Sequence, residues 1–424
     1  MKIGIIGGGA SGMAAAITAS SLGADVTLFE KNERVGKKLL ATGNGKCNLS
    51  NRHLTADCYH SETPHRIQTI LEQWGTEDTL DFFHGLGLMT REKNGGLYPL
   101  CEQASAVLDV LRFALYGVRC ETGHRVVRAE RSGGGFRIHT KKEGGQSSHT
   151  FDKIILACGS RAGLKSSDTE NGLELAKGLG LAGIPFFPAL VQLRCQESCF
   201  KALAGVRCQA EVTLEAEGNV WQERGELQLT EYGISGIPVF QLSRHAARAL
   251  VRGKKSRAIL DFLPDTEAQV WKEMLRERMR YAGFQTAEQL FTGTVHKKIA
   301  NVILKNSHIP PGEALSGISE ERLLRAGEQM QCFPVTVTGT NPVSQAQVCG
   351  GGIRLTEVTN TLEARKQPGL YVTGELLDAD GRCGGYNLQW AWATGVIAGR
   401  DAAGGRERTD SRRKPACGRF EEIR

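Results

Sequence analysis

The stretch IGIIGGGASGMAAAITA, residues 3–19, decides the fold. It starts in an apolar segment that predicts a buried strand over 2–6, and it continues into an alanine-rich segment that predicts a helix over 11–22. A second strand is expected over 25–29, directly before Glu30. A strand, a glycine-rich turn, a helix and a second strand that ends at an acid are together typical of a dinucleotide-binding βαβ unit.

The glycines of this turn have separate physical roles. Gly7 permits the tight turn, Gly9 lets the backbone approach a pyrophosphate, and Gly12 lets the helix pack closely on the strand. The phosphates are expected at the helix N-terminus, where free N–H groups attract anions and the Ser11 hydroxyl adds a donor. Glu30 can accept hydrogen bonds from both ribose hydroxyls, and its charge would repel a 2′-phosphate.

The segment KNERVGKKLLATGNGKCNLSN, residues 31–51, favours an extended cofactor. Glycines alternate there with cationic and amide residues, so the segment can present backbone N–H groups along a ligand. Lys37 and Lys38 can neutralise phosphate or cover the adenosine. The competing interpretation is a surface loop.

A second block, residues 369–399, has the pattern of the other half of an FAD site. It predicts a strand, then Glu375, a glycine turn and a long helix over 387–403. An acid at the end of such a strand can bind the ribityl hydroxyls of FAD. The helix that starts near Asn387 can direct its positive end at the flavin pyrimidine.

The order of elements predicts one discontinuous domain that carries an insertion. After the βαβ unit come helices and a β-meander, then strand-like segments over 190–262, a charged helical block over 266–330, and a closing strand and helix. The fold class is therefore α/β. We expect an FAD domain over 1–187 and 346–403, a β-rich domain over 188–264 and 331–345, a helical domain over 265–330, and a flexible basic tail over 404–424.

Composition excludes several classes of protein. Glycine makes up 52 of 424 residues, about 12% against a typical ~7%, without a collagen period. The net charge of +7 is mild and spread out, so no nucleic-acid partner is expected, and the basic tail is interpreted as a solvated end. No apolar run reaches the ~18 residues of a membrane-spanning helix.

Two further features predict a cytoplasmic location. The N-terminus has the Lys and small residues of a signal peptide, but its glycine cluster interrupts the apolar stretch that such a peptide needs. The 12 cysteines form no CxxC pair and lie in apolar segments or motifs, which predicts reduced thiols.

Four motifs carry a resemblance to a known family: GGGASG (7–12), KKLLATGNGKCNLSN (37–51), LTEYGISG (229–236) and GELLDADGRCGGYNLQWAWATG (374–395). The chain resembles the BaiN-like flavoproteins, grouped with the bile-acid Δ4,6-reductase and also labelled aminoacetone oxidase-like NAD(P)/FAD-dependent oxidoreductases. The resemblance spans nearly the whole chain. It implies a discontinuous Rossmann FAD domain of glutathione-reductase type with inserted β-rich and helical domains.

The resemblance also implies cofactor contacts by position. With the turn glycines and Gly374, the expected FAD-binding residues are Gly7, Gly9, Ser11, Gly12, Glu30, Lys37, Lys38, Asn44, Val126, Gly374, Glu375, Asn387 and Leu388. Val126 is the expected backbone contact to adenine. Members of the family often have GGGR where this chain has GNGK, so Asn44 replaces a glycine, although Asn tolerates the left-handed conformation.

No catalytic residue can be assigned from the sequence. The flavin N5 is expected to carry hydride, and Tyr232 or Tyr386 could donate a proton, although anchoring of a loop is the more ordinary role for either phenol. Arg382 could hold a substrate anion or could pair with Asp380. Cys47 is interpreted as a packing residue, and the histidines show no spacing of a metal site.

The favoured hypothesis for function is reduction of a C=C bond conjugated to a carbonyl, as in a 3-oxo-Δ4 bile acid or steroid, with NAD(P)H as a transient donor. The alternative is an oxidase of a small amine or amino ketone that passes electrons to O₂. A tRNA-associated flavoprotein is a weaker alternative, because a concentrated basic face is missing. The physiological substrate and the oligomeric state are not determined by the sequence.

Overall fold

The computed structural model describes residues 1–163, 172–281 and 283–405. The chain divides into two compact units, the first formed by Met1–Phe186 with Val348–Arg424 and the second by Phe187–Gln347. The sequence places the corresponding boundaries at 187/188 and 345/346, within two residues of this division. The predicted tail lies almost wholly outside the described residues.

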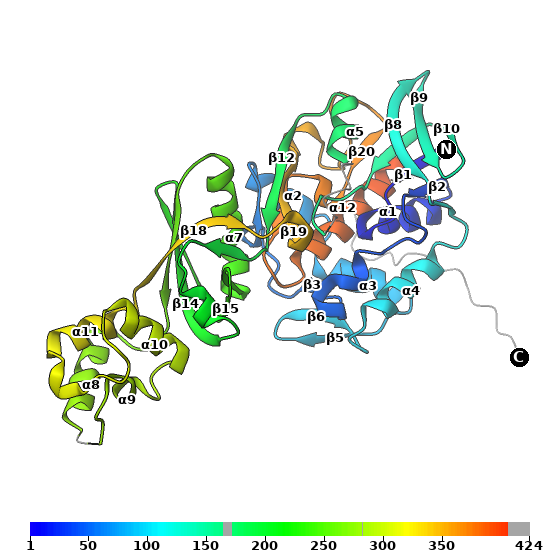
Figure 1. Ribbon diagram of the computed structural model, residues 1–424. Coiled ribbons are helices and arrows are strands. Elements are labelled where there is room, and N and C mark those ends of the chain that lie inside the picture. Colours follow the sequence, from blue (N-terminus) through cyan, green and yellow to red (C-terminus); the bar gives the residue numbers. More distant parts are fainter. Residues whose placement is uncertain (164–171, 282, 406–424) are drawn as a thin grey trace, which may run out of the picture. The chain divides into compact units, whose positions relative to one another are not determined.

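A parallel sheet forms the centre of the first unit (Figure 1). Its strands run in the order β20-β11-β1-β2-β7, and every neighbouring pair is parallel. The apolar runs KIGII and KIIL form the middle strands, because both faces of such a sheet are covered. The α/β fold class predicted from the sequence is confirmed. The strands are β1 (Lys2–Ile6), β2 (Asp25–Glu30), β7 (Arg119–Thr122), β11 (Lys153–Leu156) and β20 (Leu370–Val372).

Different layers cover the two faces of the sheet. An antiparallel meander of β8 (Arg125–Ser132), β9 (Gly135–Lys142) and β10 (Gly145–Phe151) packs through Phe151, whose ring meets that of Phe29 edge-on at 5.8 Å. The helices α1 (Ala10–Ser21) and α12 (Tyr386–Ala402) pack together on the other side. A helix from the start of the chain and one from its end therefore form one layer.

The α1–α12 contact depends on glycine. A side chain on Gly395 would overlap the carbonyl oxygen of Ser11, and a Cβ on Gly399 would lie 2.5 Å from the carbonyl oxygen of Ala15. Gly395 and Gly399 are four residues apart, so they lie on the same face of α12. Small residues on this face let the two helix backbones approach closely.

Smaller elements complete the first unit. The helices are α2 (Pro64–Leu71), α3 (Thr76–Gly85), α4 (Ala104–Ala114) and α5 (Gly172–Gly178), with 3₁₀ turns η1 (Leu39–Gly45), η2 (Ala56–Cys58), η5 (Leu355–Glu357) and η6 (Gly374–Leu376). Short strands are β3 (Ser50–Asn51), β4 (Tyr59–His60), β5 (Thr90–Lys93), β6 (Gly96–Pro99), β12 (Gly183–Ala189), β19 (Val348–Ile353) and β21 (Asp380–Gly381), of which β12 pairs with β19 and β4 with β21.

The second unit contains a closed barrel and a group of helices (Figure 1, green to yellow). The barrel order is β13-β16-β15-β14-β17-β18, and the alternating burial of β14 places every second residue inside. Its strands are β13 (Leu193–Cys195), β14 (Arg207–Ala216), β15 (Asn219–Thr230), β16 (Gly233–Gly236), β17 (Ser256–Asp261) and β18 (Phe333–Thr340). The helices are α6 (Phe200–Leu203), α7 (Ile237–Val251), α8 (Ala268–Arg280), α9 (Ala287–Phe291), α10 (Lys297–Asn306) and α11 (Glu320–Glu328), with 3₁₀ turns η3 (Leu315–Gly317) and η4 (Val343–Gln345).

Two features of the second unit differ from the sequence prediction. The interpretation of 190–262 as strand-like is wrong over α7, a helix of 15 residues with Pro238 in its first turn. The helical residues also share one apolar core with the barrel, which includes Trp271 of α8 and Val335 of β18. A separate helical domain over 265–330 therefore stays a proposal.

Candidate functional site

The turn between β1 and α1 is so tight that two of its positions have no room for a side chain. A side chain on Gly7, where φ is +111°, would overlap the carbonyl oxygen of Ala157, and one on Gly12 would overlap the carbonyl oxygen of Gly7. A Cβ on Gly9, in contrast, would meet no atom within 4 Å. Two glycines of the motif therefore close the turn, and the third borders open space at the start of α1.

The start of α1 has the chemistry of an anion site. Gly9 is the N-cap residue, and no side chain caps the helix. The first hydrogen bond of the helix runs from the Met13 amide to the Gly9 carbonyl at 2.9 Å, so the preceding amides lie at the positive end of the helix dipole. A pyrophosphate at the open side of Gly9 would meet these donors.

Glu30 lies beside this turn at the carboxyl end of β2 and is 8% exposed. Its Oε2 accepts a hydrogen bond from the Gly8 amide at 2.9 Å, and its Oε1 accepts from the Asn32 amide at 2.8 Å. These bonds fix the carboxylate beside the β1–α1 turn. This is the position from which the acid is expected to bind a ribose. We call this turn, with Glu30 and the residues around Gly374, the cradle.

The two ends of the chain meet at the same cradle. The hydroxyls of Ser11 and Thr373, 362 residues apart in sequence, are 3.2 Å apart. A Cβ on Gly374, where φ is +65°, would lie 2.6 Å from the Ser11 hydroxyl oxygen. The Gly374 amide is held by the Thr394 hydroxyl of α12 at 2.9 Å. The two sequence blocks that are predicted to bind FAD therefore lie next to each other.

Glu375, next to Gly374, connects this site to the 31–51 segment. Its Oε2 accepts from the Lys38 ammonium at 2.6 Å and from the Ser160 hydroxyl at 2.7 Å. Among the residues that the structure describes, none donates a hydrogen bond to Oε1, which leaves one oxygen for a ligand hydroxyl. Sequence reasoning missed Ser160, since its partner lies 215 residues further on and no local spacing connects them.

Asn387 and Leu388 lie in the first turn of α12, after the left-handed N-cap Gly385. The Asn387 carboxamide bonds both the amide and the carbonyl of Gly381, each at 2.8 Å. The side chain therefore holds the preceding turn in shape. What it leaves to a cofactor is its backbone amide at the helix N-terminus.

The remaining predicted contacts lie around the edge of the cradle. Val126 is the second residue of β8 and lies two residues beyond His124, whose amide donates a hydrogen bond to the Glu30 carbonyl at 3.0 Å. Asn44 is exposed and has φ of +54°, the left-handed conformation that Asn tolerates. Lys37 is exposed, and within the described part of the chain no hydrogen bond or ion pair joins Lys37 or Asn44 to the other predicted residues.

Two groups of the first unit, the Tyr386 phenol and the Cys47 thiol, have raised pKa values. Burial and a hydrogen bond that the Tyr386 hydroxyl donates to the Cys58 sulfur raise the pKa of the Tyr386 phenol to about 12. Burial raises the pKa of the Cys47 thiol to about 12. Both groups are protonated at neutral pH, so Tyr386 can donate, whereas Cys47 is a poor nucleophile. Tyr232 belongs to the second unit, where the Arg194 guanidinium lies 5.3 Å from the centre of its ring.

The Asp378 carboxylate has a structural role. It is 3% exposed and accepts hydrogen bonds from the Glu62 amide at 2.9 Å and the Ser61 hydroxyl at 3.2 Å. The Arg382 amide bonds the Cys58 carbonyl at 2.9 Å. Hydrogen bonds therefore hold residues 378–382 against β4 and the residues on either side of it.

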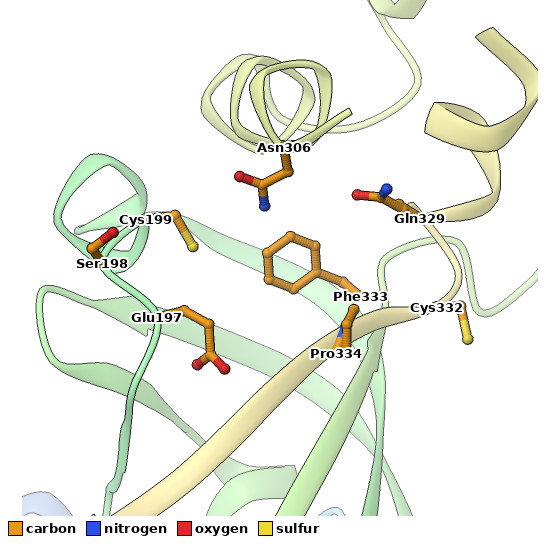
Figure 2. Close-up of a pocket in the computed structure, with 8 residues that line it drawn as sticks. All are labelled: Glu197, Ser198, Cys199, Asn306, Gln329, Cys332, Phe333 and Pro334. Atoms are coloured by element: carbon orange, nitrogen blue, oxygen red, sulfur yellow. The ribbon is translucent and has the colours of Figure 1, made fainter. Parts of the chain in front are cut away.

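The second unit has a cavity of its own, of about 540 Å³. Figure 2 shows the Phe333 ring at its centre, between the start of β18 and the loop that leads into α6. Glu197 Oε1 accepts from the Thr336 amide at 2.7 Å, while its buried Oε2 has no hydrogen-bond partner among the described residues. None of the predicted cofactor contacts lines this cavity. The lining residues are Glu197, Ser198, Cys199, Asn306, Gln329, Cys332, Phe333 and Pro334.

The cradle in the first unit fits FAD. It offers an open N-terminal helix turn for a pyrophosphate, a fixed carboxylate for a ribose, and a second carboxylate with a free oxygen for a further polyol. Comparison with known families agrees, since the model described as the HI0933-like protein Rossmann domain matches residues 1–401. The chain belongs to the HI0933-like family.

Individual relatives span almost the whole of this HI0933-like chain. It is 44% identical over 411 residues to a 3-dehydro-bile acid delta(4,6)-reductase of Clostridium scindens, covering 95% of this chain and 99% of the relative. Two ribosomal RNA dihydrouridine synthases are also similar: that of Haemophilus influenzae at 26% identity, over 92% of this chain and 95% of the relative, and that of Escherichia coli at 27%, over 94% and 96%.

The predicted resemblance to the BaiN-like flavoproteins is confirmed by the first of these relatives. The HI0933-like chain is an FAD-dependent oxidoreductase with a Rossmann-type FAD domain and additional inserted structure. Within the described residues, none of the helices has the length and apolar character required to span a membrane.

Proposed function

We propose that this HI0933-like enzyme reduces a C=C bond conjugated to a carbonyl, in a 3-oxo-Δ4 enone of bile-acid or steroid type. The observation that carries the proposal is the 44% identity to the bile-acid reductase over 95% of one chain and 99% of the other. A match of this length includes the inserted unit as well as the FAD domain, so it extends to residues outside the cofactor cradle.

The roles proposed for the residues follow from their contacts. The amides at the start of α1 bind the pyrophosphate, Glu30 binds the ribose, and Glu375 Oε1 accepts from the ribityl chain while Lys38 and Ser160 hold Oε2. FAD, when bound, supplies hydride at N5. Tyr386, protonated at neutral pH, is our candidate for the group that returns a proton.

We propose NAD(P)H as the electron donor and the cytoplasm as the location. The eleven described cysteines are all free thiols, which supports a reducing compartment. The oxidase of a small amine or amino ketone stays the alternative, in which O₂ accepts the electrons.

RNA is a second candidate substrate, because two relatives that cover more than nine-tenths of this chain are named ribosomal RNA dihydrouridine synthases. Dihydrouridine differs from uridine by reduction of the C5=C6 bond, which is also conjugated to a carbonyl. The two candidates therefore share a reaction class and differ in what carries the double bond. The higher identity to the bile-acid reductase makes the steroid-like enone our first choice.

Rapid mixing of the anaerobically reduced holoenzyme separates these functions. We expect a 3-oxo-Δ4 steroid to restore the absorbance of oxidised flavin faster than O₂, aminoacetone or unmodified ribosomal RNA does. Fast reoxidation by O₂ without a response to the enone would overturn the proposal in favour of an oxidase. Reoxidation by RNA alone would overturn it in favour of the RNA substrate.

A further inference from the structure

A groove in the inserted unit, apart from the FAD cradle, has the features of a ligand site. It is lined by residues from the end of α7 and from the hairpin of β14 and β15, and it has a volume of about 410 Å³, a size typical of sites for small molecules. Its lining residues are Glu217, Asn219, Trp221, His245, Arg248 and Arg252.

An aromatic platform forms one wall of the groove. The rings of Trp221 and His245 are stacked, with centroids 4.0 Å apart and an angle of 15° between their planes. Burial, followed by the charges of Arg244 and Arg248, lowers the pKa of His245 to about 4. The stack is therefore uncharged at neutral pH, and Trp221 is only half-buried.

Guanidinium groups form the other wall. Arg248 and Arg252 are one helical turn apart, so they lie on the same side of α7 and its end. Arg252 pairs with Glu217 at 3.3 Å. The Arg248 guanidinium has no hydrogen bond or ion pair within the described ranges of the chain, which leaves its donors available to a ligand.

The surroundings add positive charge. Lys254, Lys255 and Arg257 follow in sequence and are exposed, whereas Glu217 is the one carboxylate that lines the groove. A ligand with a negative charge is thus favoured, and its charge would meet Arg248 first, because Arg252 is already paired.

We propose that this groove binds a nucleotide, with the base on the Trp221 platform and a phosphate on Arg248. A flat ring and an unpaired guanidinium are the groups that recognise a base and a phosphate, respectively. The site is additional to the flavin and enone sites of the proposed function. A free nucleotide, including the adenosine half of a dinucleotide, and a single RNA strand share this chemistry.

Titration calorimetry of the FAD-saturated holoprotein tests the site, because bound FAD keeps added nucleotide out of the Rossmann cradle. We expect ADP or a short oligouridylate to bind, with an affinity that falls as salt is added. Arg248→Gln and Trp221→Leu should each weaken binding by about tenfold. Arg325→Gln, which removes an exposed arginine of α11 in the same unit, should change binding by less than about twofold.

The two probes distinguish the sources of the nucleotide. Binding of ADP without a gain for the oligouridylate assigns the groove to a free nucleotide, and tighter binding of the oligouridylate assigns it to a strand. If the wild type binds neither probe, or if Arg248→Gln binds as the wild type does, the proposal is wrong. The reoxidation experiment does not require a ligand in this groove when dithionite is the reductant, so the two proposals fail separately.

Discussion

At the scale of single residues, the glycines of the β1–α1 turn differ in whether a side chain would fit. A Cβ at Gly12 would overlap backbone, whereas a Cβ at Gly9 would meet nothing. Both belong to the same motif, and the structure shows that the fold requires a glycine at position 12 but has room for a side chain at position 9.

We therefore expect Gly12→Ala and Gly9→Ala to fail in different ways. Gly12→Ala should destabilise the apoprotein by about 3 kcal/mol, because the Gly7 carbonyl cannot move without opening the turn. Gly9→Ala should leave the melting temperature of the apoprotein unchanged, since φ is −82° there, but should weaken FAD binding by about tenfold. Calorimetry of the apoprotein and fluorescence titration with FAD measure both quantities; equal melting temperatures for the two variants would contradict the assignment.

His245 predicts a dependence of stability on pH. Its folded pKa of about 4 lies below the ordinary value of 6.5, so the unfolded chain binds more protons between these values. The stabilising contribution is complete above pH 6.5 and is lost as the pH falls toward about 4. His245→Gln should reduce this loss, as measured by urea unfolding at neutral pH and at acidic pH.

The matched control for that experiment is His65→Gln, which removes an exposed histidine of α2. It should show the same loss of stability on acidification as the wild type. An identical pH dependence for His245→Gln and the wild type would show that His245 does not titrate in this range.

Much of the cradle could be predicted residue by residue, since the turn glycines and both acids lie in motifs with fixed spacing. The roles of side chains with distant partners could not. Ser160 was missed because its hydrogen bond to Glu375 spans the insertion, and the carboxamide of Asn387 bonds its own turn, which no spacing reveals.

At the scale of elements, the contact between α1 and α12 depends on backbone proximity. Gly399→Ala should force these helices apart and destabilise the protein by about 1–3 kcal/mol. Bound FAD should be lost as well, because Ser11 of α1 and Thr394 of α12 hold Thr373 and Gly374 in place. Gly178→Ala, at an exposed position of α5 where a Cβ meets nothing, should be neutral or slightly stabilising. Thermal unfolding and FAD content of the two variants check this; a similar effect of both substitutions would show that helix spacing is not the cause.

The helix α7 shows where element prediction from the sequence fails. Its buried residues Val239, Leu242, Ala246 and Ala249 have helical spacing, and Pro238 occupies the first turn. The segments before and after α7 alternate polar and apolar residues, as strands do. The prediction of strands was therefore continued across α7 as well. The N-terminal βαβ unit was predicted more closely, since every signal within it agreed.

At the scale of the whole molecule, the chain leaves and re-enters the first unit on paired strands. A Cβ on Gly351 of β19 would lie 2.6 Å from the carbonyl oxygen of Pro185 of β12, so the two ends of the insertion lie close together. We expect a protein in which a short glycine-serine linker replaces 187–347 to fold and to bind FAD. It should lose enone reduction, because we expect the residues that contact the substrate to lie in the insertion.

Flavin fluorescence and the steroid assay on this shortened protein check both expectations. A folded shortened protein without FAD would show that the cradle requires the insertion. Retained enone reduction would show that the substrate contacts lie in the first unit instead.

The contact between Ser11 and Thr373 also has a consequence for when the pocket can form during synthesis of the chain. These hydroxyls lie 362 residues apart, and a ribosome that adds about 5–20 residues per second needs roughly 20–70 s to make the chain between them. For most of that interval the glycine turn has been made, while the strand and helix that complete its pocket do not yet exist. Early in synthesis FAD therefore meets only one half of this pocket, and the complete pocket can form only once residues 370–402 have been made.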